Sequence, residues 1–255
     1  EQPTESRTLS IIIKDETGNQ LNLYNAVDFL TLENNAAPLF NIDVGENAYP
    51  SFADIDNDND LDLLVGTASG ELKLFINDGN SLTPDFIQLA SSNTLLTEFA
   101  SSFHSTPSFV DIDNDGDQDL FIGDSDGFIR LIRNTSTGSS LSYQQSAASE
   151  NPFSGIDAGS LAKISFVDID GDRDLDAFIS NSLGNIRFFL NSGTASNPSF
   201  SEKLMNENPL YTIKGYFSVV TTFIDIDKDD DYDLVLGNTA GSLVLYENTG
   251  SAKAA

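Results

Sequence analysis

Short apolar runs separated by polar turns extend along nearly the whole chain. In their first clear copy the runs are five to seven residues long and rich in Phe, Ile, Leu and Val. They lie at residues 51–55, 61–67, 71–77 and 84–90. Runs of this length, bounded by Asn, Gly, Ser and Pro, predict short β-strands, and the alternation at Leu72, Leu74 and Ile76 is typical of a strand with one buried face. No segment shows a helical pattern, so we predict an all-β fold.

The pattern repeats with a fixed period. A nine-residue acidic stretch begins at Asp54, Asp111, Asp168 and Asp225, so successive copies are 57 residues apart (111−54, 168−111 and 225−168). A Phe two residues before each stretch, a Gly after it and an Asn at the end of the next apolar run keep the same step. Four strands in each of four units predict radially repeated sheets, a four-bladed β-propeller, because the strands of a sandwich rarely recur so regularly.

The two ends of the chain predict how the ring closes. The aromatic residues of the fourth strands, Phe86, Tyr143 and Phe200, keep the 57-residue step, which leads back to Phe29 and forward to a position beyond residue 255. The last unit therefore lacks its outer strand, and we expect residues 27–32 to complete that blade and remove an open edge.

We divide the chain into an N-terminal extension, residues 1–26, and a propeller, residues 27–255. The extension contains a strand-like run at residues 8–15 that is out of phase with the repeats. Such a strand packs on its own ring or pairs with a neighbouring subunit, and head-to-tail donation would build a filament.

The amino-acid composition excludes several classes of binding partner. The chain has 12 basic and 40 acidic residues, a formal charge of −28, which repels phosphate backbones and anionic lipid surfaces. No run of 18 apolar residues is present, and there is no cysteine. We therefore expect no nucleic-acid partner, no membrane insertion and no disulfide or thiolate metal site.

The acidic stretches suit a hard cation. Each has Asp at all five odd positions of nine, and calcium takes six to eight oxygen ligands from a short loop that turns sharply near position 6. An acidic run is most often a solvated surface, but here 20 aspartates account for most of the charge (−28 + 20 = −8). Two carboxylates about 4 Å apart repel by roughly 4 kcal/mol at an effective dielectric constant near 20. We therefore predict up to four bound Ca²⁺. Catalytic use of these carboxylates is disfavoured because an active site is normally singular.

The motif Phe-x-Asp-apolar-Asp-x-Asp-Gly-x-x-Asp-apolar, followed by a Gly and a strand, resembles the FG-GAP or VCBS-type repeats of integrin-α-like β-propellers. The resemblance covers residues 27–250 and implies calcium ligands from the side chains at loop positions 1, 3, 5 and 9 and from the carbonyl at position 7. In the loop at residues 54–62 these are Asp54, Asp56, Asp58 and Asp62, with Asp60 for the carbonyl, and in the loop at 111–119 they are Asp111, Asp113, Asp115 and Asp119, with Asp117. In the loop at 168–176 they are Asp168, Asp170, Asp172 and Asp176, with Asp174, and in the loop at 225–233 they are Asp225, Asp227, Asp229 and Asp233, with Asp231.

The four loops differ at position 6, where a left-handed backbone is expected. The residue there is Gly116 in the second loop but Asn59, Arg173 and Asp230 in the others. Glycine adopts this conformation without strain and arginine does so least readily. We therefore expect the second site to be the best formed and the third the least certain, although Gly171 at position 4 relaxes its path. The side chain at position 7 is not required by the pattern, and we expect it to face water or a water bound to the cation.

Three functional classes follow. The first is a secreted, bacterial, calcium-stabilised module for adhesion or assembly, because such loops fill where calcium is millimolar. The second is a glycan-binding lectin, with stacking on Tyr49, Tyr216 or Tyr232, although the chain has no tryptophan. The third is a polysaccharide-cleaving enzyme. It would require the chain's scattered basic residues to converge on one pocket, namely Arg130, Arg133, Arg187 and His104. We expect no enzymatic activity, and we expect Asn134, which begins an N-x-S/T signal, to be a turn residue.

Overall fold

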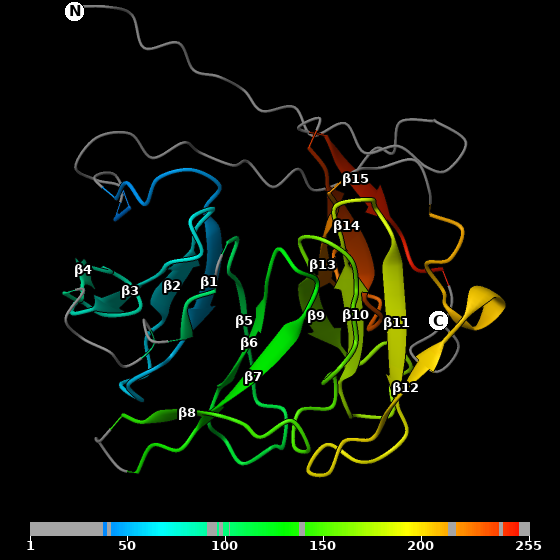
Figure 1. Cartoon of the computed structure of the whole chain (residues 1–255), viewed down its shortest axis with the longest axis horizontal. Coiled ribbons are helices and arrows are strands. Elements are labelled where there is room, and N and C mark those ends of the chain that lie inside the picture. The colour runs from blue at the N-terminus through cyan, green and yellow to red at the C-terminus, as the bar shows by residue number, and fades with distance from the viewer. Residues whose placement is uncertain are drawn as a thin grey trace, which may run out of the picture.

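The computed structural model describes residues 38–39, 42–90, 96, 99–101, 103–137, 141–213, 218–239 and 242–249. Four small antiparallel sheets follow one another along the chain, one for each repeat, and together they form a four-bladed β-propeller (Figure 1). The predicted all-β fold is therefore confirmed. The described helical structure is one short 3₁₀ turn, η3 (Met205–Glu207). No helix among the described residues has the length and apolarity needed to cross a membrane.

Three of the four predicted runs of the first unit contain a strand, and the first run, residues 51–55, overlaps one that begins two residues earlier. The first sheet consists of β1 (Tyr49–Ala53), β2 (Asp62–Gly66), β3 (Leu72–Asn77) and β4 (Phe86–Gln88). The second consists of β5 (Thr106–Val110), β6 (Asp119–Gly123), β7 (Ile129–Asn134) and β8 (Tyr143–Gln145). The third consists of β9 (Lys163–Val167), β10 (Asp176–Ser180), β11 (Ile186–Asn191) and β12 (Phe200–Lys203). In each sheet the strands pair in sequence order.

The fourth sheet ends one strand short in the described part of the chain. It contains β13 (Val220–Ile224), β14 (Asp233–Gly237) and β15 (Leu243–Tyr246). The expectation that the last unit lacks its own outer strand stays a prediction, because the residues after 249 lie outside the described ones. The predicted closing strand at residues 27–32 and the extension at residues 1–26 lie outside the described residues.

The second strand of each blade is the centre of the core. All five residues of β2, β6 and β10 are buried. Side chains alternate across a strand, so in β6 Phe121 packs into the cluster shared with the third blade, while Leu120 and Ile122 pack into the cluster shared with the first. The second strands of the first three blades are thus buried on both faces, which explains why their residues after the leading Asp are apolar or small.

Neighbouring blades approach closely where the second strand ends. A Cβ atom on Gly66 would lie 1.9 Å from the carbonyl oxygen of Ser105, so only glycine fits there. The equivalent residue of the third blade is Ser180, whose hydroxyl donates a hydrogen bond of 2.9 Å to the carbonyl oxygen of Val219. Both the glycine in the first blade and the serine in the third allow the second strand of one blade to pack against the segment that leads into the next blade.

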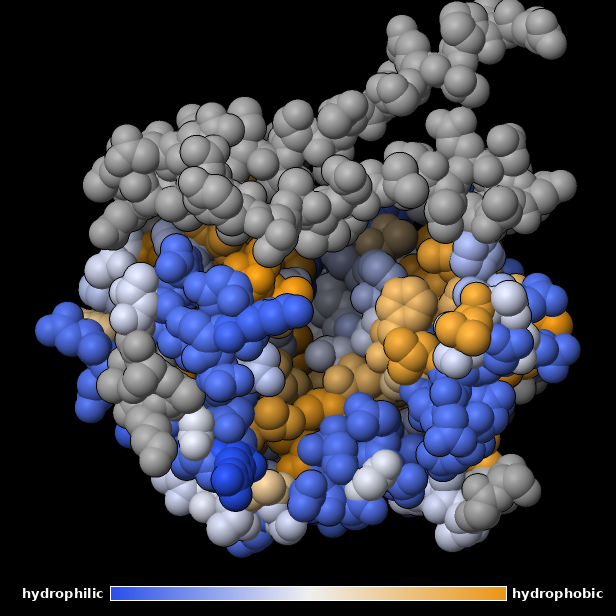
Figure 2. All heavy atoms as spheres, turned by 180° about the vertical axis from the view of Figure 1, so that it is seen from behind, coloured by the Kyte–Doolittle hydropathy of each residue, from blue (hydrophilic) through white to orange (hydrophobic). Residues whose placement is uncertain are grey.

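The inner strands surround the axis of the ring. β1 contacts β5, β5 contacts β9, and β9 contacts β13. The Nζ atom of Lys163, at the start of β9, lies 5.2 Å from the centre of the Tyr49 ring, at the start of β1. Figure 2 views the molecule from behind, on the face opposite to that of Figure 1. This face is hollowed at its centre, with hydrophobic residues along parts of the wall of the hollow and many hydrophilic residues outside it.

Candidate metal centres

Each acidic stretch forms the loop between the first and second strands of a blade and ends on the first residue of the second strand. Position 6 is left-handed in every loop, with φ of 73° at Asn59, 97° at Gly116, 78° at Arg173 and 71° at Asp230. The expected sharp turn is therefore present in all four copies. Position 4 is left-handed as well, including Gly171 with φ of 72°. The loops thus share one backbone course whichever residue occupies position 6.

The position-1 carboxylate organises each loop. In the second loop the two oxygens of Asp111 accept hydrogen bonds from the backbone N–H groups of Asp115 (3.1 Å) and Gly116 (3.0 Å). The position-5 carboxylate then accepts from the N–H of position 7, as Asp115 does from Asp117 at 3.0 Å. The other three loops repeat both contacts. These bonds bend the chain around a centre toward which carboxylates converge.

The structure brings together the carboxylates of positions 1, 3 and 5. Within each triad one oxygen from every aspartate lies within 4.8 Å of the others. The triads are Asp54, Asp56 and Asp58; Asp111, Asp113 and Asp115; Asp168, Asp170 and Asp172; and Asp225, Asp227 and Asp229. One triad therefore stands at the same place in every blade.

The negative charge of these carboxylate triads is favourable only if a positive charge lies nearby. Burial, followed by the neighbouring aspartates, raises the pKa of Asp56 and of Asp170 above the ordinary value. Oδ1 of Asp56 and Oδ1 of Asp113 are buried without a hydrogen-bond partner among the described residues. Buried polar atoms are normally paired. Orphaned oxygens in a donor set made only of carboxylates and carbonyls fit a hard divalent cation, and calcium accepts such ligands in flexible geometry.

In three of the loops the position-7 side chain is buried. Asp60, Asp174 and Asp231 are only 4–6% exposed, and Oδ1 of each has no hydrogen-bond partner within the described structure, so these side chains do not face bulk water; contact with a cation-bound water stays a prediction. Asp117, in the second loop, is partly exposed.

The position-9 carboxylate is a buried connection between loop and sheet. Asp62 is fully buried. Its Oδ1 accepts a hydrogen bond of 2.8 Å from the backbone N–H of Asn77, at the end of β3, and its Oδ2 accepts one of 2.9 Å from Ile55. Asp176 and Asp233 make the same pair of contacts. Position 9 lies outside the 4.8 Å clusters, and its role as a cation ligand stays a prediction.

Burial of this carboxylate has an electrostatic consequence. It raises the pKa of Asp62 and of Asp119 to about 6 and that of Asp176 to about 7. The ionised forms are therefore held at a cost that their donors only partly offset; these are two backbone N–H groups at Asp62 and Asp176, and one backbone N–H group together with Arg133 at Asp119. A cation near these loops would lower that cost.

The Asp–Asn contact is a feature that sequence reasoning missed. Each position-9 aspartate precedes its asparagine by 15 residues in all four units, and this constant spacing was the available signal. The asparagine side chain serves the turn that follows: Oδ1 of Asn77 accepts from Gly79 and Asp85, and Oδ1 of Asn134 accepts from Ser136 at 3.0 Å. Asn134 is itself the last residue of β7, and its side chain serves the turn that follows; that it is not a glycan site stays a prediction.

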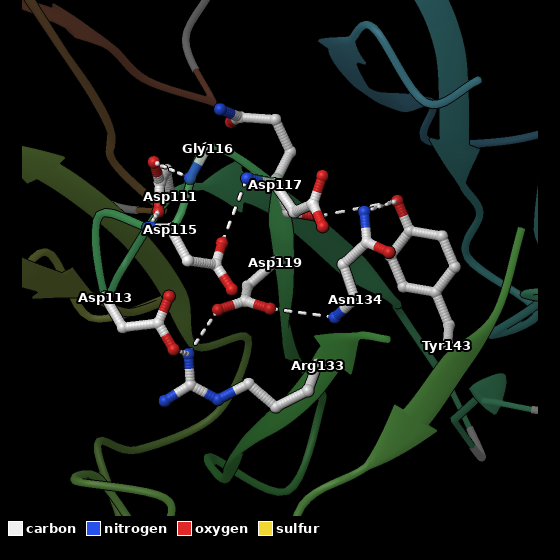
Figure 3. Close-up of polar contacts among 10 residues, drawn as sticks. Asp111, Asp113, Asp115, Gly116, Asp117, Asp119, Arg133, Asn134 and Tyr143 are labelled. Carbon is white, nitrogen blue, oxygen red and sulfur yellow. Dashed lines mark hydrogen bonds and ion pairs between the residues drawn. The ribbon is translucent and has the colours of Figure 1, made fainter. Parts of the chain in front are cut away.

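A basic side chain from the third strand of the blade reaches the carboxylates of the second loop, whereas the basic residues within the third and fourth loops, Arg173 and Lys228, are exposed. The Nη1 atom of Arg133, at the end of β7, lies 2.8 Å from Oδ2 of Asp113 and also contacts Oδ2 of Asp119. Figure 3 shows the guanidinium between the two carboxylates. The residues one or two periods away are Ile76, Leu190 and Glu247. The expectation that the second loop is the best formed rested on Gly116 alone and did not include this contact.

Two of the other basic residues named from sequence, Arg187 and His104, have separate partners. Arg187 forms a two-pronged ion pair with Glu202 (2.7 and 2.8 Å). Nδ1 of His104 lies 3.3 Å from the hydroxyl of the half-buried Tyr49. Together with Arg133 in the second loop, these contacts place three of the four basic residues at different sites. Tyr232 is 43% exposed, and Tyr216 lies outside the described residues.

Comparison with known families bears directly on the repeated loop. The sequence pattern of the FG-GAP-like repeat matches residues 54–122 and again residues 111–179, so each match begins at position 1 of a loop. The chain is an FG-GAP-like repeat protein. Its FG-GAP-like repeats advance by the same 57 residues as the blades (111−54), and the third and fourth blades repeat the same strands and loops.

No curated protein matches the chain. Among solved structures, one reported for specific recognition of non-reducing terminal N-acetylglucosamine by an Agrocybe aegerita lectin is 18% identical, with a TM-score of 0.47. The match covers 82% of this chain and 51% of the lectin, so this chain spans about half the length of that protein.

Proposed function

We propose that this chain is a calcium-stabilised propeller that acts outside the cell as a non-catalytic adhesion or assembly module. The observation that carries the proposal is the recurrence of one Asp triad, with its ligand atoms within 4.8 Å, in the same loop of all four blades. Loops of this kind in extracellular modules bind calcium at about 10⁻⁴–10⁻³ M, which favours a compartment with millimolar calcium. Four Ca²⁺ would leave a formal charge of −20 (−28 + 8).

The residues of each loop would have two roles, binding the cation and attaching the loop to the sheet. Carboxylates at positions 1, 3 and 5 would hold the cation, with the backbone carbonyl and the buried side chain of position 7 beside them. The position-9 aspartate ties the loop to the end of the third strand, as Asp62 does through Asn77. Bound calcium supplies positive charge that offsets the repulsion among these groups. Its effect would be to hold one end of each blade rigid, which suits a module that presents surfaces to partners.

The assembly part of the proposal concerns the fourth blade and the N-terminus. In the described structure the fourth sheet ends at β15, and Leu243 at its start is 48% exposed. A strand supplied by residues 27–32 would complete this sheet, and the extension at residues 1–26 would remain for pairing with another copy. An exposed strand edge is a ready template for such pairing.

The test compares particle sizes by analytical ultracentrifugation and negative-stain microscopy. In millimolar calcium we expect the full chain to form head-to-tail assemblies and a variant lacking residues 1–26 to remain monomeric. A variant lacking only residues 1–7 keeps the strand-like run at 8–15 and is the matched control, expected to assemble. If the 1–26 deletion assembles like the full chain, that segment is not the donor, and a monomeric full chain would leave only the adhesion function.

A second candidate function is glycan binding, favoured by a pocket at the outer part of the third blade. The pocket has a volume of about 430 Å³. Its lining includes Tyr211, which is 42% exposed, together with Asn185 and the Arg187–Glu202 pair. An aromatic ring beside amide and charged groups suits a sugar ring. On a glycan array we expect a Tyr211→Ala variant to lose any binding that the unmodified chain shows, with Tyr232→Ala as the control. An array without a hit would remove this candidate.

A further inference from the structure

A positive charge from β7 is paired with the carboxylates of the second loop. Arg133 donates from Nη1 to Oδ2 of Asp113, at 2.8 Å, and to Oδ2 of Asp119. Asp113 belongs to the triad of this loop, and Asp119 is its position-9 residue. The guanidinium therefore uses one oxygen of a predicted cation ligand and lies within the acidic cluster (Figure 3).

The hydrogen bonds around position 9 change accordingly. In the first, third and fourth loops the position-9 Oδ2 accepts from the backbone N–H of position 2, at 2.9, 3.4 and 3.0 Å. Within the described second loop, Asp119 receives no such bond from Ile112, and Oδ2 accepts from Arg133 in its place. The guanidinium has thus replaced an internal contact shared by the other three loops.

The source of the difference is one residue at the end of the third strand. Ile76 and Leu190, the equivalents in the first and third blades, carry no charge, and Glu247 in the fourth blade is exposed and acidic. Arg133 is only 27% exposed at its side chain, and Asp119 is 3% exposed, so their ion pair is largely shielded from solvent. Shielded charged hydrogen bonds are stronger than those on the surface.

We propose that Arg133 is a built-in counter-ion of the second loop, so that this loop binds calcium more weakly than the other three. The inference rests on the proposed calcium function. A cation entering the second triad must displace the guanidinium from Asp113 or tolerate its charge nearby. Losing one hydrogen bond between charged groups corresponds to roughly a ten- to hundred-fold weaker site. The second loop would also keep its shape when calcium is scarce, because Arg133 already neutralises part of its charge.

The experiment measures calcium binding to the full chain by isothermal titration calorimetry. For the unmodified chain we expect three tight sites and one that is ten- to hundred-fold weaker. Arg133→Leu introduces the residue that the third blade has at this position and should convert the weak site to a tight one. Asp115→Asn, added to Arg133→Leu, should remove the site that was gained, which assigns it to the second loop.

Two further variants serve as controls. Glu247→Arg places a guanidinium at the equivalent exposed position of the fourth blade, so it should weaken a second site by a similar factor. Arg187→Leu removes an arginine that pairs with Glu202 outside the loops, and it should leave the isotherm unchanged.

The outcomes separate the two proposals. Four equivalent sites in the unmodified chain, or an Arg133→Leu isotherm identical to it, would overturn the role of Arg133 while leaving the calcium function intact. A chain that binds no calcium in any variant would overturn the proposed function itself. If Arg133→Leu does not fold, the Glu247→Arg variant still decides the question, since an unchanged fourth site contradicts the proposal.

Discussion

Chelation of calcium is expected to lower the midpoint of thermal unfolding of this chain by about 20 °C in low-salt buffer. A ligand that binds only the folded state at about one hundred times its Kd stabilises that state by about 2.7 kcal/mol, so three tight sites contribute about 8 kcal/mol. A chain of this size shifts its midpoint by roughly 2–4 °C per kcal/mol. Without the cation, the 20 loop aspartates repel one another across the triads.

The measurement is differential scanning calorimetry in saturating calcium and after exhaustive chelation, with back-titration of calcium as the control for reversibility. Raising the salt concentration in the calcium-free sample should recover only part of the loss, because the triad carboxylates are partly buried and screening acts mainly on exposed charges. An unchanged midpoint in calcium-free, low-salt buffer would contradict the calcium function.

Replacing a position-9 aspartate should destabilise the protein whether or not calcium is present. Asp62→Ala leaves the buried N–H groups of Ile55 and Asn77 without their acceptor. Each unsatisfied buried donor costs about 1–3 kcal/mol, so we expect a loss of roughly 4 kcal/mol in the free energy of unfolding. Urea unfolding in saturating calcium and in chelator checks this value. The isosteric Asp62→Asn variant keeps one acceptor and should lose about half as much.

Asp58→Asn is the matched control for that experiment. Asp58 is exposed at position 5 of the same loop, and an asparagine there still offers an oxygen to the N–H of Asp60. It should therefore lose stability in calcium but change little in chelator. If Asp62→Ala and Asp58→Asn behave alike under both conditions, position 9 acts only as a cation ligand and its hydrogen bonds contribute nothing separate.

Much of the architecture was predictable because it depends on local sequence patterns that recur along the chain. Apolar runs of strand length, glycine turns and the 57-residue step predict four equivalent sheets, and the alternation of aspartates predicts the oxygen cluster in each loop. The phase of Phe86, Tyr143 and Phe200 predicted that the last sheet would end early, and β15 is its last described strand. These features depend on the order of residues within a few positions and on the period, both of which a sequence displays directly.

The hydrogen bonds and ion pairs of the individual loops depend on contacts between neighbouring strands, which the sequence alone does not display. Whether Asp62 meets Asn77 is decided by the pairing of β2 with β3, and whether Arg133 reaches Asp113 is decided by where β7 ends beside the loop. By residue type alone, Gly116 marked the second loop as the best site and Arg173 marked the third as the weakest. The folded chain gives both loops the same turn and places a guanidinium in the second. Sequence by itself determined the period, the strands and the acidic triads, since those follow from side-chain type and local spacing. Only the tertiary structure decided which charges are buried, which are paired and which loop holds its own counter-ion, because strand pairing joins residues that are 14 to 20 positions apart.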